Sequence, residues 1–428
     1  MAALGGLTSL EAARTPNLDR LDREGTAGLA YNVPEGMEAS SAVACMSVMG
    51  FDPAAHYAGR GPIEAMAMGL ELEPGQIAMR CNLVTVRDGR LVSYSAGNIT
   101  SEESAELIAA LRERLDGDLA GEVGQQRLGL HAGVGFRHIF TVRDGAELLS
   151  TTFTPPHDIA DRPVAGFGPV GPGAGLACRL MEWSKGVLAG HPVNRDRIAR
   201  GELPATQIWL FWPGTRPERM PTFAETYGGR RAALTSSVDL LRGLALQTGM
   251  DCLVIPGVTD GGDNDYEAQM AGALEALDDH DVVFVHVEAP DEASHAGDVA
   301  GKVRAIEQVD ALMVPQVVAM RERVENDHRA GEDTGSGAAR AGADGDRGTA
   351  RAGDPGGVSL LVLPDHPTPL ETKTHVAEPV PFVMWGSGFE ANGAEAFTET
   401  EARATGFAVA PGHLLMSMFL GDGPEVGT

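Results

Sequence analysis

Five acidic and imidazole side chains stand next to apolar segments that have the character of buried strands. They are Asp291 and His295 after residues 281–287, Asp365 and His366 after residues 358–363, and His375 before residues 380–385. Open parallel sheets bind ligands at the carboxyl ends of their strands, so we expect these side chains to gather at one edge. Carboxylates combined with neutral imidazoles suit Mn, Zn or Co better than Ca. Five ligands exceed the need of one tetrahedral ion, and the pattern therefore predicts two neighbouring divalent ions, which can clamp a phosphoryl group.

A structural interpretation competes with this one. A single Asp or His after a strand more often caps a helix or forms a turn than binds a ligand. Five such residues beside three strands of one predicted sheet favour a metal site over a series of unrelated turns.

The elements that must hold these residues alternate as strand and helix from about residue 204 onward. Their strands are continuously apolar, which is typical of a mostly parallel central sheet with helices on both faces, and this predicts an α/β fold. Residues 80–170 instead run in α+β order, with a hairpin turn at Asp88-Gly89, and predict a small inserted domain. The expected organisation is a core made of residues 1–79 and 171–428, interrupted by this insertion.

Composition argues against several functions. The formal net charge of −27 disfavours nucleic acids and anionic membranes as partners. No segment has the length and apolar character of a membrane span, and the N-terminal residues lack the apolar core of a signal peptide. The four cysteines form no CxxC pair and sit in apolar surroundings, which indicates reduced thiols and a cytoplasmic location. Residues 326–357, rich in Gly, Ala and charge, predict a disordered surface insertion.

The chain contains, in this order, the segments TPNLDRLDREG, GFDPAAHYAGRGPIEA, AMRCNLVTV, APDEASHAGD, PDHPTP and THVAEPVPF. Together they resemble the alkaline-phosphatase superfamily and, more narrowly, its archaeal-type cofactor-independent phosphoglycerate mutases, over nearly the whole chain. The resemblance implies a two-metal core domain with a small inserted domain. It also implies a serine that takes a phosphoryl group from the substrate and returns it to a neighbouring hydroxyl, without 2,3-bisphosphoglycerate.

By matched position, the resemblance assigns the metal ligands to two ions. One ion takes Asp291, His295 and His375, and the other takes Asp365 and His366. The family's nucleophile precedes the Gly of GFDP by nine residues, and this register selects Ser41. A serine at a helix start suits the role, because the N-terminal amides stabilise an alkoxide or an attached phosphate. The structural alternative is that Ser40 and Ser41 only cap the helix.

Seven further residues match motifs that would bind a substrate carrying a phosphate and a carboxylate. They are Arg60, Arg80, Asn82, Arg137, His138, His157 and Asp158. Guanidinium groups bind both anions in bidentate fashion, although a surface salt bridge is an equal alternative for each residue taken alone. We expect the inserted domain to act as a lid, with Arg137, His157 and Asp158 facing the metal cluster across a cleft.

Two departures from the family pattern matter. The family opens with a strand ending in Asp-Gly, whose Asp binds the second metal, whereas Met1 matches a position downstream of that strand. The resemblance therefore implies a core that lacks its first strand. Around the nucleophile, Ser40, Ala42, Val43 and Cys45 stand where the family has Gly, Asp, Thr and His. This loss of polar neighbours indicates an altered substrate preference or a weakened activity.

The leading hypothesis is a metal-dependent phosphoglycerate mutase that interconverts 3- and 2-phosphoglycerate through phospho-Ser41 in glycolysis and gluconeogenesis. Its partner is a small phosphorylated metabolite, and its two divalent ions are expected to be Mn, with Zn, Co or Mg as alternatives. The sequence leaves the oligomeric state open. One alternative function is a homoserine kinase-like phosphotransferase of the same family, and another is a catalytically impaired relative that binds metal or phosphorylated metabolites.

Overall fold

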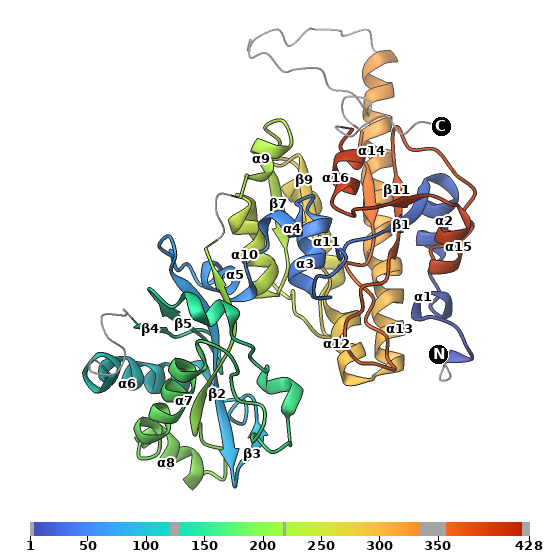
Figure 1. The fold of residues 1–428 in the computed structure, drawn as a ribbon. Coiled ribbons are helices and arrows are strands. Elements are labelled where there is room, and N and C mark those ends of the chain that lie inside the picture. The colour runs from blue at the N-terminus through green and yellow to red at the C-terminus, as the bar shows by residue number, and fades with distance from the viewer. Residues whose placement is uncertain (1–3, 120–127, 217–219, 334–356, 422–428) are drawn as a thin grey trace. The chain divides into compact units, whose positions relative to one another are not determined.

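The computed structural model describes residues 4–119, 128–216, 220–333 and 357–421. The chain forms two compact units, the first made of Met1–Tyr57 with Met220–Thr428 and the second of Ala58–Arg219 (Figure 1). The second unit is thus inserted into the first. It contains all of the predicted insertion 80–170 and extends beyond it at both ends.

The first unit contains two sheets, with strand orders β10-β11-β1-β12 and β8-β7-β9. Its strands are β1 (Thr26–Ala30), β7 (Ala232–Thr235), β8 (Asp251–Leu253), β9 (Val282–Val285), β10 (Leu360–Val362), β11 (Val380–Trp385) and β12 (Ala408–Val409). Its helices are α1 (Ser9–Ala12), α2 (Pro16–Glu24), α3 (Ser41–Val48), α4 (Pro53–His56), α9 (Phe223–Thr226), α10 (Asp239–Gln247), α11 (Tyr266–Ala276), α12 (Ala289–Ala296), α13 (Val299–Gln308), the π-helix η4 (Val309–Met313), α14 (Val314–Asp333), α15 (Glu399–Ala404) and α16 (Leu414–Phe419).

The four-stranded sheet is buried on both faces, which explains why β11 is apolar at every position. Its Val383 and Trp385 pack with residues of α2 and α14, whereas Phe382 and Met384 pack with Leu415 of α16 on the other face. A strand covered on both sides has no solvent face on which polar residues could alternate. β11 nevertheless runs antiparallel to both β1 and β10, so a continuous apolar pattern did not identify a parallel strand here.

The three-stranded sheet is parallel throughout, with β7 between β8 and β9. Together with its covering helices it confirms the predicted α/β class. The expected single central sheet, however, is divided in two. Among the described residues, β9 pairs only with β7 and β10 pairs only with β11, so each strand has one edge without a strand partner.

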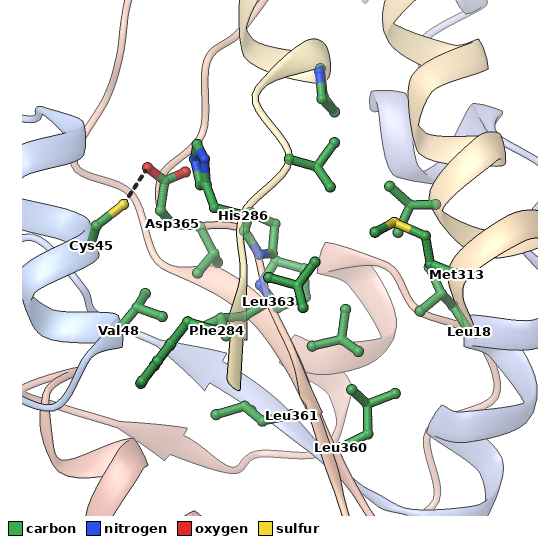
Figure 2. Close-up of a pocket in the computed structure, with 18 of the residues that line it drawn as sticks. Leu18, Cys45, Val48, Phe284, His286, Met313, Leu360, Leu361, Leu363 and Asp365 are labelled. Carbon is green, nitrogen blue, oxygen red and sulfur yellow. Dashed lines mark hydrogen bonds between the residues drawn. The ribbon is translucent and has the colours of Figure 1, made fainter. Parts of the chain in front are cut away.

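A cavity of about 1060 Å³ is lined by both of these strands. Its walls include the apolar residues Val282–Val285 and Leu360–Leu363, and Leu18 and Met313 line it as well (Figure 2). Polar residues, among them Cys45 and Asp365, line the end of the cavity that follows the carboxyl ends of β9 and β10. The carboxyl ends of β9 and β10, which belong to different sheets, therefore lie at the same polar part of the cavity.

The second unit is a sheet covered by helices. Its strands are β2 (Ile77–Arg87), β3 (Arg90–Ser93), β4 (Leu128–His131), β5 (Arg137–Val142) and β6 (Gln207–Thr215), and its helices are α5 (Arg60–Ala67), α6 (Ser101–Leu119), η2 (Ala146–Ser150), η3 (Pro156–Ile159), α7 (Ala174–Leu188) and α8 (Pro192–Ala199). The predicted hairpin is confirmed: Arg87 pairs with Arg90, and Asp88 and Gly89 both have the positive φ of a tight turn.

The expected place of β6 in the fold was wrong. Its apolar sequence predicted the first strand of the parallel core, but β6 pairs antiparallel with β2 inside the second unit. Helix α14 corrects another expectation, because it continues to Asp333 and so covers the first part of the predicted disordered segment 326–357. Residues 334–356 lie outside the described residues. In the described part of the chain, no helix combines the length and apolarity needed to cross a membrane.

Candidate active site

Three of the predicted ligands converge beside helix α12. Asp291 and His295 lie four residues apart on this helix, which places both side chains on one face. His295 Nε2 lies 3.0 Å from Asp291 Oδ2 and 3.1 Å from His375 Nε2, and His375 Nε2 lies 3.6 Å from Asp291 Oδ1. The structure thus brings together the three residues that the sequence assigned to one ion.

A second polar pair lies next to this group. The Asp365 carboxylate is 3.1 Å from His366 Nε2, and the His366 ring centroid is 4.0 Å from that of His375. Asp291, His366 and His375 each offer one ligand atom within 4.8 Å of the other two. The five predicted ligands therefore occupy one continuous cluster in the first unit.

Ser41 joins the cluster at the first residue of α3. Its Oγ lies 3.1 Å from His366 Nε2. Ser40 occupies the N-cap position of this helix, but its side chain makes no capping hydrogen bond. The capping alternative thus finds no support in the hydrogen bonds of Ser40, and the Ser41 hydroxyl lies beside the Asp365–His366 pair.

Hydrogen bonds to neighbouring groups hold the ligands in orientation. His295 Nδ1 lies 2.9 Å from the Lys373 carbonyl oxygen, which leaves Nε2 facing Asp291 and His375. Thr368 donates to Asp291 Oδ1 at 2.5 Å, and its hydroxyl is 3.2 Å from His366 Nδ1. Second partners of this kind are typical of metal-ligating histidines and carboxylates.

The pKa values of Asp291 and His295 are shifted in the directions that favour a negative carboxylate beside a positive charge. Burial works to raise the pKa of Asp291, but hydrogen bonds from His295, His375 and Thr368 outweigh it and hold that pKa far below its ordinary value. The hydrogen bond to Asp291 in turn raises the pKa of His295 to about 9. A proton on His295 thus balances the half-buried Asp291 carboxylate. The donor set of carboxylates and imidazoles fits a divalent transition ion that would replace this proton.

Two residues of the cluster were not selected from the sequence as functional. Thr368 belongs to the PDHPTP segment, and Cys45 donates from its thiol to Asp365 Oδ2 at 3.4 Å (Figure 2). The spacing of Cys45 could have revealed it, because Ser41 and Cys45 are four residues apart on α3, as Asp291 and His295 are on α12.

The seven predicted substrate-binding residues all belong to the second unit. Arg80 and Asn82 lie on β2, and Arg137 lies opposite Asn82 on β5. Arg80 is buried, forms an ion pair with Glu64 and donates to Asn82 Oδ1 at 3.1 Å. Glu64 also accepts from Arg60 at 2.7 Å, so one buried carboxylate holds two guanidinium groups.

An aromatic group adjoins this pair of arginines. The Arg60 guanidinium lies 4.0 Å from the Trp212 ring centroid, and the His157 ring lies 5.3 Å from the same indole. Asp158 is exposed, with Oδ1 3.7 Å from His157 Nε2, and Arg137 is exposed over the ring of Phe136. Of this group, Glu64 and Trp212 were not singled out from the sequence.

His138 differs from the expectation of a substrate-binding residue. Only 1% of it is exposed, and its Nδ1 accepts a hydrogen bond from the Gly133 amide. Burial, with a smaller contribution from Arg80, lowers the pKa of His138 to about 3, so the ring is neutral. The neutral ring accepts a hydrogen bond from the loop between β4 and β5 and carries no positive charge that would attract an anion.

Two family models match the chain. One is described as 2,3-bisphosphoglycerate-independent phosphoglycerate mutase and matches residues 23–194, and the other is described as Metalloenzyme superfamily and matches residues 354–421. The mutase of that name from Methanothrix thermoacetophila is 40% identical over 420 residues, which cover 98% of this chain and 96% of the relative. A probable mutase of the same name from Geobacter sulfurreducens is 40% identical over 425 residues, with the same coverage.

Solved structures are similar as well. The PH0037 protein from Pyrococcus horikoshii matches with a TM-score of 0.71 and 25% identity, over 100% of this chain and 95% of that one. The cofactor-independent phosphoglycerate mutase from Thermoplasma acidophilum matches with a TM-score of 0.58 and 23% identity, over 98% and 95% of the two chains, and shares the fold.

Proposed function

Because the chain belongs to the family of 2,3-bisphosphoglycerate-independent phosphoglycerate mutases, we propose that it interconverts 3- and 2-phosphoglycerate through a phosphoserine at Ser41. The observation that carries this proposal is the 3.1 Å separation between Ser41 Oγ and His366 Nε2. This distance supports Ser41 as the nucleophile, because its hydroxyl lies at the edge of the Asp and His cluster. A glycolytic role and a cytoplasmic location accompany this function as predictions.

Two divalent ions would be held by the cluster. Asp291, His295 and His375 fit one ion, and Asp365 and His366 fit the other, with manganese as the metal expected from the oxygen and nitrogen donors. When bound, such ions polarise phosphoryl oxygens and favour the deprotonated form of a nearby hydroxyl. The Thr368 hydroxyl would keep Asp291 oriented toward the ion, and the Lys373 carbonyl would do the same for His295.

The transfer takes two steps at Ser41. In the first, Ser41 Oγ loses its proton and bonds to phosphorus, while the ester oxygen of the substrate leaves and gains a proton, which yields glycerate. In the second, the other hydroxyl of glycerate attacks phospho-Ser41 and the serine recovers its proton. The residue at the start of α3 suits both steps, because the amides of the first helical turn stabilise an attached phosphate.

Basic residues of the second unit would recognise the anionic groups of the substrate. Arg60 and Arg137 carry exposed or half-buried guanidinium groups that can bind a phosphate or a carboxylate. Arg80 is buried against Glu64 and Asn82, and would contribute by holding these neighbours in place. His138 is buried and neutral and does not belong to this group.

An enolase-coupled assay with 3-phosphoglycerate and added Mn²⁺ tests the function. The wild type should turn over, and Ser41→Ala should lose activity by several orders of magnitude while its circular dichroism is unchanged. Ser40→Ala is the matched control and should retain most activity, because the adjacent hydroxyl makes no capping bond. Equal activity of wild type and Ser41→Ala would contradict the assignment, and ATP-dependent phosphorylation of homoserine without mutase activity would support the kinase alternative.

A further inference from the structure

We propose that Cys45 binds the second metal ion through its thiolate, beside Asp365 and His366, so that this site prefers Zn²⁺ or Co²⁺ to Mn²⁺. The inference rests on the proposed two-metal centre and concerns which ion one of its sites selects. It assigns a metal-binding role to a cysteine that stands where the family pattern has histidine.

The position of Cys45 results from the same helix that carries the nucleophile. Ser41 and Cys45 stand one helical turn apart on α3, so both side chains reach the Asp365–His366 pair from one face. The Cys45 sulfur lies 3.4 Å from Asp365 Oδ2, and this oxygen lies 3.1 Å from His366 Nε2 (Figure 2). Ser41 Oγ lies 3.1 Å from the same nitrogen. In the series Cys45 Sγ, Asp365 Oδ2, His366 Nε2 and Ser41 Oγ, each atom thus lies within 3.4 Å of the next.

In the pairs Cys45–Asp365 and Asp365–His366, the atoms are close enough to bind the same ion. With a zinc–sulfur distance of about 2.3 Å and a zinc–oxygen distance of about 2.0 Å, two tetrahedral ligands stand about 3.5 Å apart. Carboxylate oxygen and imidazole nitrogen at about 2.0–2.1 Å from zinc stand about 3.3 Å apart by the same geometry. The observed 3.4 and 3.1 Å lie near these values.

Cys45 is buried, yet its sulfur contacts a polar group. Only 4% of the residue is exposed, and its neighbours on α3 are the fully buried Val43 and Ala44. A cysteine that served only to fill this apolar helix would contact other apolar groups, yet its sulfur contacts the carboxylate of a proposed metal ligand. Thiolate donors favour Zn²⁺ and related soft ions, whereas a set of oxygen and nitrogen donors alone also suits Mn²⁺. Binding would exchange the S–H bond for a metal–sulfur bond and release the proton to solvent.

Titration of the metal-free protein with Co²⁺ tests the proposal by absorption spectroscopy. Sulfur bound to Co²⁺ gives an intense near-ultraviolet charge-transfer band, whereas oxygen and nitrogen ligands give only the weaker visible bands. The wild type should show the intense band, and Cys45→Ser should lose it while keeping the visible bands. Cys252→Ser is the matched control and should keep both, since Cys252 hydrogen-bonds to the Arg242 carbonyl elsewhere in the unit.

A calorimetric titration gives an independent readout. Cys45→Ser should weaken Zn²⁺ binding at one of two sites by about tenfold or more, and should release fewer protons than the wild type. Circular dichroism of each variant verifies its folding, and Cys45→Ala repeats the test if the serine variant unfolds. Co²⁺ binding without the charge-transfer band would overturn the role of Cys45 but leave the metal centre standing. Absence of any Co²⁺ binding would instead contradict the two-metal centre itself.

Discussion

His295 and His375 direct their Nε2 atoms at each other across 3.1 Å, and both atoms lie within 3.6 Å of the Asp291 carboxylate. His295 comes from α12, whereas His375 comes from the segment before β11. His375 precedes β11, whose start lies at the same edge of its sheet as the carboxyl end of β10, and α12 brings Asp291 and His295 to the same point. This is the geometry that a bound ion would require.

Removal of metal should therefore destabilise the protein. An ion that binds only the folded state stabilises it by about 2.7 kcal/mol at 100 times its Kd. We expect a chelator to lower the Tm in calorimetry, and excess Mn²⁺ to restore it. His375→Ala should reduce this metal-dependent shift, whereas His280→Ala, which alters a histidine paired with Asp251, should leave the shift intact. A chelator-independent Tm in the wild type would contradict metal binding by the cluster.

Asp22 should make stability depend on pH independently of the metal. This residue of α2 is 1% exposed, and burial, followed by the nearby Asp19 and Glu401, raises its pKa to about 7. The folded protein thus keeps a proton that the unfolded chain releases near its ordinary pKa of 3.8, and the free energy of unfolding falls as pH rises from about 4 to about 7.

Asp22→Asn removes this effect with little change of shape. At pH 8 the variant should be more stable than the wild type by up to about 4 kcal/mol, since each unit of pKa shift corresponds to about 1.4 kcal/mol. The difference should shrink toward zero at pH 4. Urea unfolding at both pH values measures it, and an equal difference at the two would show that the carboxyl does not titrate as described.

Shortening an apolar side chain that lines the cavity beside β9 and β10 should cost less stability than shortening one in the packed core. Leu244 of α10 is fully buried, and Leu→Ala at such a position costs about 2–5 kcal/mol. Leu361 lines the cavity, so part of its surface lacks packing partners already. We expect Leu361→Ala to reduce the free energy of unfolding by less than half as much as Leu244→Ala, measured by denaturant titration. Equal costs would mean that Leu361 is packed as tightly as Leu244.

Local sequence signals predicted those features that depend on neighbouring residues. The Asp88-Gly89 turn fixed the β2–β3 hairpin, because both positions need a positive φ that this dipeptide adopts readily. The position of the acidic and imidazole residues next to apolar strands predicted that they would gather, and they do lie together in one cluster.

Features that depend on distant partners were not predictable in this way. The apolar strands β6 and β11 are antiparallel, and no signal within either strand distinguishes them from the parallel β7 and β9. Burial on both faces produces the same continuous pattern in each direction. The contact of Cys45 with Asp365 was not predictable for a related reason, since a cysteine in an apolar helix has the pattern of a core residue until Asp365 is placed beside it.

The most direct test of the account is to identify the residue that carries the phosphoryl group. The Mn²⁺-loaded protein is mixed with 3-phosphoglycerate, quenched in acid during turnover, digested and mapped by mass spectrometry. We predict phosphate on Ser41 in the peptide that begins α3, and its absence from the Ser41→Ala variant. Turnover with an unmodified Ser41, or with phosphate on Ser40 or another residue, would contradict transfer through Ser41.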